Sequence, residues 1–199
     1  MKRDFQYKLE ACKPRVCTRG GVGLRAVGVG GRDVLSVMGM CPGGRGPPGG
    51  GVAGVVVDVG DGGTHGLCNG DEVYGFGAGV LGSYALTDGR LAAVKPPSWT
   101  FDQACAMPTT WVTVCTGFEE HTRLLAGHRL LVHAATGGVG LTAVRYASST
   151  GAEVYATAGR ESKHEYLRSS MGISAGRIGS SRDCVASMAW NQEQKLTRK

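Results

Sequence analysis

This chain of 199 residues has few aromatic side chains, no long apolar run and no paired cysteine motif. Phe, Trp and Tyr make up only 7% of the residues, so small aliphatic side chains must provide most of any core. No apolar run approaches the roughly eighteen residues that a membrane span needs, and the first ten residues, MKRDFQYKLE, lack the apolar centre of a signal peptide. We therefore expect a soluble, cytoplasmic protein without a membrane partner.

The seven cysteines are widely spaced, and no two of them form a C-x-x-C pair. An odd number of scattered cysteines indicates reduced thiols rather than a disulfide framework, and it argues against structural zinc. The five histidines stand alone in the sequence. We interpret His133, at the end of an apolar strand, as a hydrogen-bonded core residue rather than a metal ligand.

The net charge of +6 is concentrated at the two ends of the chain. Residues 1–19 carry six Lys or Arg against two acids, and residues 191–199 carry three against one. The body between them has no net charge, which argues against a basic face that binds nucleic acid.

The segment 129–163 has the pattern of a dinucleotide-binding βαβ unit. Leu130 to Val132 is an apolar strand, Gly137, Gly138 and Gly140 follow it, and AEVYA at 152–156 is a second strand after a helix of suitable length. Glycine permits a tight turn, close approach of a pyrophosphate and close packing of the helix on the strand, while the helix N-terminus offers free N–H groups. With Val139, these glycines are the predicted pyrophosphate site.

The tip of the second strand indicates which cofactor is bound. Domains that prefer NAD carry an acid about 20 residues after the glycines, where this chain has 157–159, Thr-Ala-Gly, followed by Arg160 and Lys163. A neutral tip beside two cations favours NADPH, although Glu161 lies between the cations. The alternative is that Ser162 and Glu165 form a capping box and the cations belong to a solvated helix turn.

The first half of the chain is rich in glycine and proline, with short β-type runs at 22–29, 52–59, 72–74 and 83–86. This pattern predicts a small β-barrel or sandwich. After residue 100, a Thr-x-x-Gln capping signature begins a helix that we expect to end at Pro108, and a second helix is expected over 110–121.

The parallel sheet after the second strand is expected to be short. Only 177–180 is a candidate third strand, whereas a doubly wound sheet has about six strands. The nucleotide-binding part is therefore predicted to lack its C-terminal half, and the last residues are expected to be a frayed helix or a disordered end.

Several segments resemble one known family. RAVGVGGRDVLSVMGM (25–40), GDEVYGFGAG (70–79), VHAATGGVGLTAV (132–144), EVYATAGRESKHEYLR (153–168) and GSSRD (179–183) are similar to the enoylreductase domains of type I polyketide and fatty acid synthases, within the medium-chain dehydrogenase/reductase superfamily. The resemblance implies a GroES-like substrate-binding β-barrel at 1–100, a truncated Rossmann NADP-binding domain at 101–190 and a disordered tail at 191–199.

The resemblance also implies a reaction and its residues. Hydride from NADPH would reduce the double bond of an enoyl thioester on an acyl carrier protein, and the partners would be other synthase domains in the same polypeptide. Lys163 and Asp183 match residues placed near the nicotinamide, and Thr113 matches a threonine beside its carboxamide. The sequence leaves three roles open for Lys163, namely catalysis, 2′-phosphate binding or a surface turn, and Thr113 is equally compatible with core packing.

The chain departs from the family pattern at two places. Zinc-containing members have a Cys–Asp pair and a Gly-His-Glu run where this chain has Arg32–Asp33 and 49–51, Gly-Gly-Gly, so metal-independent chemistry is expected. A tyrosine implicated in protonation in some members falls at Gly31. Two alternative functions are a free-standing quinone oxidoreductase-like enzyme and an inactive fragment or binding module.

Overall fold

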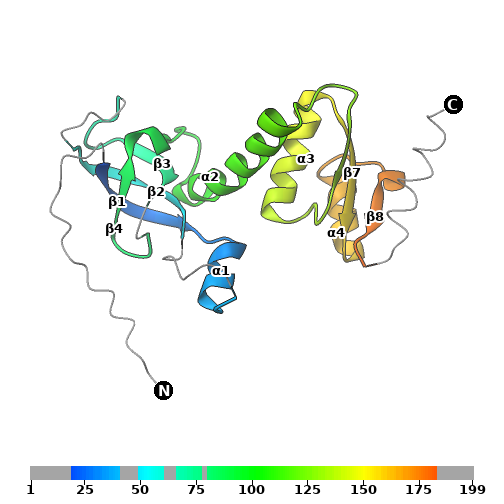
Figure 1. The fold of residues 1–199 in the computed structure, drawn as a ribbon, viewed down its shortest axis with the longest axis horizontal. Coiled ribbons are helices and arrows are strands. Elements are labelled where there is room, and N and C mark those ends of the chain that lie inside the picture. Colours follow the sequence, from blue (N-terminus) through cyan, green and yellow to red (C-terminus); the bar gives the residue numbers. More distant parts are fainter. Residues whose placement is uncertain (1–18, 41–48, 61–65, 78–79, 183–199) are drawn as a thin grey trace, which may run out of the picture. The chain divides into compact units, whose positions relative to one another are not determined.

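The computed structural model describes residues 19–40, 49–60, 66–77 and 80–182, and the ribbon is shown in Figure 1. The chain divides into two compact units, Met1–Pro108 and Thr109–Lys199. The two predicted architectures, one antiparallel and one parallel, each fall within one unit.

The first unit is built on one antiparallel sheet with the strand order β4-β1-β2-β3-β5. Its strands are β1 (Arg19–Gly28), β2 (Gly51–Asp58), β3 (Glu72–Phe76), β4 (Tyr84–Asp88) and β5 (Ala92–Val94). The four β-type runs of the sequence are thus confirmed as strands. Sequence analysis missed the three-residue β5, the turn of 3-10 helix η1 (Gly89–Leu91) before it, and helix α1 (Gly31–Val37). Closure of this sheet into a GroES-like barrel stays a prediction.

Small aliphatic side chains form the cores of this unit, as the low aromatic content required. Val22, Val56 and Val73 pack with Leu67 in one cluster, and Val52, Val80 and Ala85 form a second cluster. Strand β2 is buried at five of its eight positions, which places it at the centre of the packing as well as at the centre of the sheet.

Helix α2 (Phe101–Cys115) corrects the prediction of two helices separated at Pro108. The proline lies inside the helix, where the missing N–H and the ring clash usually cost about 3 kcal/mol or more. Burial at both ends explains why the helix continues. Ala104 and Cys105 belong to a core cluster of the first unit, and Val114 belongs to the core of the second. The range 110–121 predicted for the second helix is helical throughout, as the second half of α2 followed by the π-helical turn η2 (Thr116–His121).

The capping box at the start of α2 is confirmed. The Thr100 N–H donates to Gln103 Oε1 at 3.1 Å, and the Gln103 N–H donates to Thr100 Oγ1 at 3.2 Å. Replacing Thr100 by alanine is expected to lower the free energy of unfolding by about 1 kcal/mol, because one helix N–H loses its partner. Urea denaturation of the two proteins measures this difference. Thr100→Ser, which keeps the hydroxyl, should retain most of the stability, and equal losses in both variants would contradict the capping role.

The second unit is a parallel three-stranded sheet with the order β6-β7-β8 among the residues that the structure describes. Its elements are β6 (Arg129–Val132), α3 (Gly138–Thr150), β7 (Glu153–Ala158), α4 (Glu161–Ser169), the 3-10 turn η3 (Ala175–Arg177) and β8 (Ile178–Ser180). Strands β6 and β7 pair in parallel from Arg129↔Glu153 to Val132↔Ala156. The predicted βαβ unit and the predicted third strand are both confirmed.

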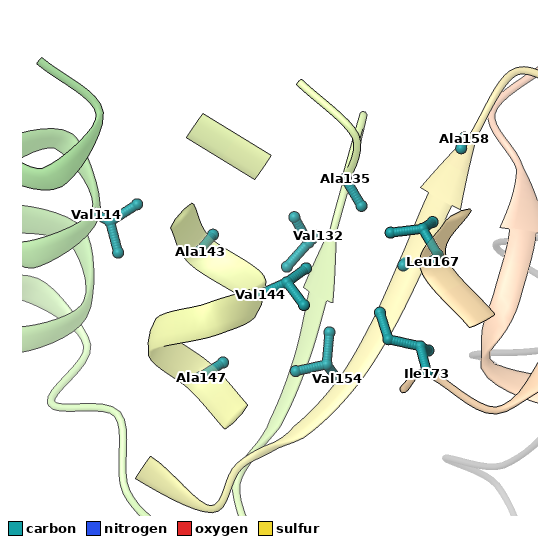
Figure 2. Close-up of a cluster of buried hydrophobic side chains, with 11 residues drawn as sticks. Val114, Val132, Ala135, Ala143, Val144, Ala147, Val154, Ala158, Leu167 and Ile173 are labelled. Atoms are coloured by element: carbon teal, nitrogen blue, oxygen red, sulfur yellow. The ribbon is translucent and has the colours of Figure 1, made fainter. Parts of the chain in front are cut away.

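The core of this unit is drawn in Figure 2. Helix α3 contributes Ala143, Val144 and Ala147, which face Val132 of β6 and Val154 of β7. From the α4 side, Leu167 is fully buried and Ile173 lies near it. Alanine and valine on α3 allow the helix to lie close to the sheet, which fixes where its N-terminus points.

Two sequence expectations concern the ends of the chain and membranes. The disordered tail predicted at 191–199 lies outside the described residues. Within the part of the chain that is described, no helix is both long enough and apolar enough to cross a membrane.

Candidate functional site

The loop between β6 and α3 turns the chain sharply at the C-terminal end of the parallel strand. Ala134 has a φ of 49°, so a residue with a side chain adopts the left-handed conformation at this turn. Its carbonyl accepts the Gly137 N–H at 2.8 Å, and Gly137 is then the N-cap of α3. The tight turn that we assigned to a glycine is therefore made by an alanine, at a cost typically about 1–2 kcal/mol.

The three predicted glycines have different structural roles. A Cβ on Gly140 would lie 2.5 Å from the Ala134 oxygen and 2.7 Å from Ala135 Cα, so only glycine lets α3 pack this closely on the turn. A Cβ on Gly138 would meet only the methyl group of Thr110 at 3.4 Å, which is ordinary contact. Gly138 is exposed, so the fold does not require glycine there, and its role in binding a pyrophosphate stays a prediction.

The N-terminus of α3 can hold an anion. The first N–H groups of a helix have no acceptor within the helix, and here they belong to Gly138, Val139 and Gly140. Val139 is 42% exposed, so this first turn reaches the surface. The geometry agrees with the predicted pyrophosphate site, whose residues stay predictions.

Hydrogen bonds tie the glycine turn to the tip of β7. The Ala135 N–H donates to the Thr157 carbonyl at 3.0 Å, and His133 Nδ1 lies 3.2 Å from Thr157 Oγ1. Thr157 is only 2% exposed, so its hydroxyl is a fixed anchor. His133 itself is exposed, which corrects its interpretation as a core residue, because the chain has already left the strand at Val132.

Helix α4 begins two residues earlier than a capping box at Ser162 and Glu165 would require. Arg160 is the N-cap and makes no side-chain capping bond, while Glu161 is the first helical residue. Ser162 is therefore inside the first turn, and the capping box proposed for Ser162 and Glu165 is wrong. Glu165 instead pairs with Arg168 at 2.8 Å.

Glu161 does not neutralise the two predicted cofactor cations. Its carboxylate contacts Arg168 at 2.6 Å and His164 at 3.2 Å. The Arg168 hydrogen bond, assisted by His164, lowers the pKa of Glu161. Arg160 and Lys163 are exposed, and within the described residues neither forms an ion pair. Both cations remain available to a ligand at the tip of β7.

One cation at this tip was missed by sequence analysis. The Ser181 N–H donates to the Ala158 carbonyl at 3.0 Å, which joins the chain after β8 to the end of β7. The side chain of Arg182 then lies over Gly159, with Nε 3.3 Å from the position of an added Cβ. Parallel pairing of β7 with β8 was the available signal, because it places the residues after both strands at one sheet edge.

Asp183 and Thr113 are the remaining predicted site residues. Asp183 lies outside the described residues. Thr113 is exposed, so the alternative of core packing is wrong, and its hydroxyl donates to the Thr109 carbonyl one helical turn earlier at 2.7 Å. Within the described residues this bond to its own helix is the hydrogen bond that the Thr113 hydroxyl makes, and its role beside a nicotinamide stays a prediction.

The segments at Arg32–Asp33 and 49–51 match the positions of metal ligands in zinc-containing members of the superfamily that the sequence resembles, but here Asp33 makes backbone hydrogen bonds. Asp33 Oδ2 accepts the Gly30 N–H and Oδ1 accepts the Gly49 N–H, both at 2.7 Å. The Asp33 carboxylate thus joins the start of α1 to residues 49–50, which immediately precede β2. Among the described residues, no group of three or more His, Cys, Asp or Glu side chains is placed to hold a metal ion.

The chain is similar in sequence to segments of very large synthases. It is 43% identical over 173 residues to the spectinabilin polyketide synthase system protein NorB of Streptomyces orinoci, an alignment that covers 87% of this chain and 8% of that protein. It is 41% identical over 180 residues to the erythronolide synthase EryA2 of Saccharopolyspora erythraea, which covers 90% of this chain and 5% of that protein. No family model matches the chain.

Solved structures of similar fold include oxidoreductases. The CurK enoyl reductase is 32% identical with a TM-score of 0.77, over 86% of this chain and 54% of that one. The Escherichia coli quinone oxidoreductase complexed with NADPH is 27% identical with a TM-score of 0.73, over 86% of this chain and 53% of that one. The chain therefore spans about half the length of the solved proteins that it matches.

Proposed function

Because the chain belongs to the medium-chain dehydrogenase/reductase superfamily and is related to modular polyketide synthases, we propose that it is part of an enoylreductase domain of such a synthase. The domain would use NADPH to reduce the α,β double bond of an enoyl thioester carried by an acyl carrier protein. The observation that carries the proposal is the C-terminal edge of the parallel sheet, where the N-terminus of α3 offers free N–H groups beside the tip of β7. Among the described residues at that tip, Arg160 and Lys163 form no ion pair, and the acid between them, Glu161, is paired with Arg168.

The residues at this edge fit a phosphorylated dinucleotide. The exposed Gly138 leaves space for a pyrophosphate against the first N–H groups of α3, since an added Cβ meets only a methyl group there. The neutral end of β7, with Arg160 and Lys163 in no ion pair within the described residues, suits a 2′-phosphate rather than a free ribose hydroxyl. When bound, NADPH supplies the hydride that is transferred to the β-carbon of the substrate.

The protein must stabilise the charge that develops on the thioester carbonyl oxygen and deliver a proton to the α-carbon. We assign these tasks to Lys163 and Asp183, on the basis of the family resemblance. Thr113 would orient the nicotinamide carboxamide with its exposed hydroxyl. Lys163 lies in the first turn of α4, which follows the tip of β7, so in this proposal its ammonium group either donates to the substrate or joins Arg160 at the 2′-phosphate.

A second candidate function is a quinone oxidoreductase-like reaction with a diffusible substrate, which the similarity to the Escherichia coli enzyme favours. The third is a binding module without turnover. NADPH oxidation in the presence of crotonyl-pantetheine or of a quinone separates them. Enoylreductase function predicts oxidation that depends on the thioester, the second candidate predicts oxidation with the quinone, and cofactor binding without oxidation of either kind would support the binding module.

We predict that the chain binds NADPH at least about tenfold more tightly than NADH, since each charge-assisted contact to a 2′-phosphate contributes on the order of 1.5–3 kcal/mol. Titration of cofactor fluorescence gives both dissociation constants. Replacing Arg160 and Lys163 together by glutamine should weaken NADPH binding and leave NADH binding nearly unchanged. Equal affinities of the unmodified chain for the two cofactors would contradict this assignment.

A further inference from the structure

The tip of β7 is covered by a side chain that comes from the neighbouring strand. Strand β8 pairs with β7 through Ala158↔Ser180, and the Ser181 N–H donates to the Ala158 carbonyl. The Arg182 N–H donates to Ser180 Oγ at 3.1 Å, which closes a tight turn immediately after β8. The backbone on both sides of Ser181 is therefore fixed relative to the end of β7.

This turn directs the guanidinium group of Arg182 across Gly159. An added Cβ on Gly159 would lie 3.3 Å from Arg182 Nε and from Ser181 Oγ, and 3.9 Å from Arg182 Cζ. Arg182 thus lies where a side chain at the strand tip would otherwise extend. In NAD-preferring domains that place is taken by the acid that accepts from the ribose 2′-hydroxyl.

We propose that Arg182 is the residue that determines cofactor specificity, by binding the 2′-phosphate from the β8 side while Arg160 binds it from the α4 side. The inference rests on the proposed dinucleotide-binding function. An arginine suits this task because its planar donor fork matches phosphate geometry, and within the described residues Arg182 forms no ion pair that would compete. Glycine at position 159 leaves room for this placement, because an added Cβ would lie in tight contact with Arg182 Nε at 3.3 Å.

The test uses the full chain and compares two arginines at opposite ends of the same strand. Arg182→Gln removes the proposed contact, and Arg177→Gln is the matched control, because Arg177 precedes β8 and pairs with Glu153 at 3.3 Å. The probes are NADPH, NADH, adenosine 2′,5′-bisphosphate and adenosine 5′-monophosphate, each titrated by calorimetry. Thermal unfolding of each variant reports whether the fold is retained.

We expect Arg182→Gln to raise the dissociation constants for NADPH and the bisphosphate by about ten- to a hundredfold. The dissociation constants for NADH and the monophosphate should change by less than about twofold. Arg177→Gln should change none of the four dissociation constants. A second variant, Gly159→Asp, places a carboxylate beside Arg182 and should lower the preference for NADPH over NADH by at least about tenfold.

Two results would overturn the inference in distinguishable ways. The first is that the unmodified chain binds NADPH, but Arg182→Gln keeps the full preference for NADPH over NADH or weakens the binding of both cofactors equally. In that case Arg182 does not recognise the 2′-phosphate, and the proposed function still stands. If the unmodified chain binds neither NADPH nor the bisphosphate, the dinucleotide-binding function itself fails, and the inference fails with it.

Discussion

Replacement of Gly140 by alanine is expected to prevent stable folding of the second unit. The new methyl group would lie 2.5 Å from the Ala134 oxygen and within 2.8 Å of two backbone atoms of Ala135. Backbone atoms cannot move aside as a flexible side chain can, so α3 would have to shift away from β6. We expect a loss of about 3 kcal/mol or more, which is a large fraction of the stability of a small domain.

Gly138→Ala is the matched control for this experiment, because it adds the same methyl group two residues earlier, where the nearest atom is 3.4 Å away. Urea denaturation followed by far-ultraviolet circular dichroism compares the two variants with the unmodified chain. If Gly140→Ala is as stable as Gly138→Ala, close packing of the helix on the turn is not the reason for glycine at position 140.

Replacement of Gly138 by valine is expected to abolish NADPH binding while the second unit stays folded. The exposed first turn of α3 can then no longer be approached by a pyrophosphate, because the branched side chain covers its N–H groups. We expect the dissociation constant for NADPH to rise by about a hundredfold or more, which corresponds to roughly 2.7 kcal/mol. Fluorescence titration of NADPH measures it.

Gly176→Val is a suitable comparison for the valine substitution. A Cβ at Gly176 meets nothing within 4 Å, and the residue lies in η3, before the start of β8. This variant should bind NADPH as the unmodified chain does. Retained NADPH affinity in Gly138→Val would mean that the glycine turn serves the fold alone.

Local sequence patterns were sufficient to predict the elements whose conformation depends mainly on their own residues. The strand, glycine turn and helix at 129–150 follow from apolar periodicity and helix-capping rules, and the Thr100–Gln103 box follows from its spacing. Short elements that depend on tertiary partners were missed. Strand β5 has three residues and exists because it pairs with β3, and α1 begins where Asp33 accepts two backbone N–H groups.

In the candidate site, too, residues placed by local sequence could be predicted, and a residue placed by strand pairing could not. Arg160 and Lys163 could be predicted because they follow the strand tip directly in the sequence. Arg182 could not, because its position over Gly159 depends on the register between β7 and β8. Pro108 led to a wrong helix boundary, since the local cost of proline was outweighed by the burial of Ala104 and Val114 on either side of it.

One pairing in the first sheet, β1 with β4, joins strands that lie much farther apart along the chain than the paired strands of the second sheet, and this difference bears on the order of folding. In the first unit Arg19 of β1 pairs with Asp88 of β4, whereas in the second unit Arg129 of β6 pairs with Glu153 of β7. The first pairing closes a loop roughly threefold longer, which costs about 1 kcal/mol more in chain entropy. Local contacts form faster than distant ones. Strand β4 should therefore acquire its hydrogen-exchange protection after β6 and β7 have acquired theirs, although those two strands are synthesised later.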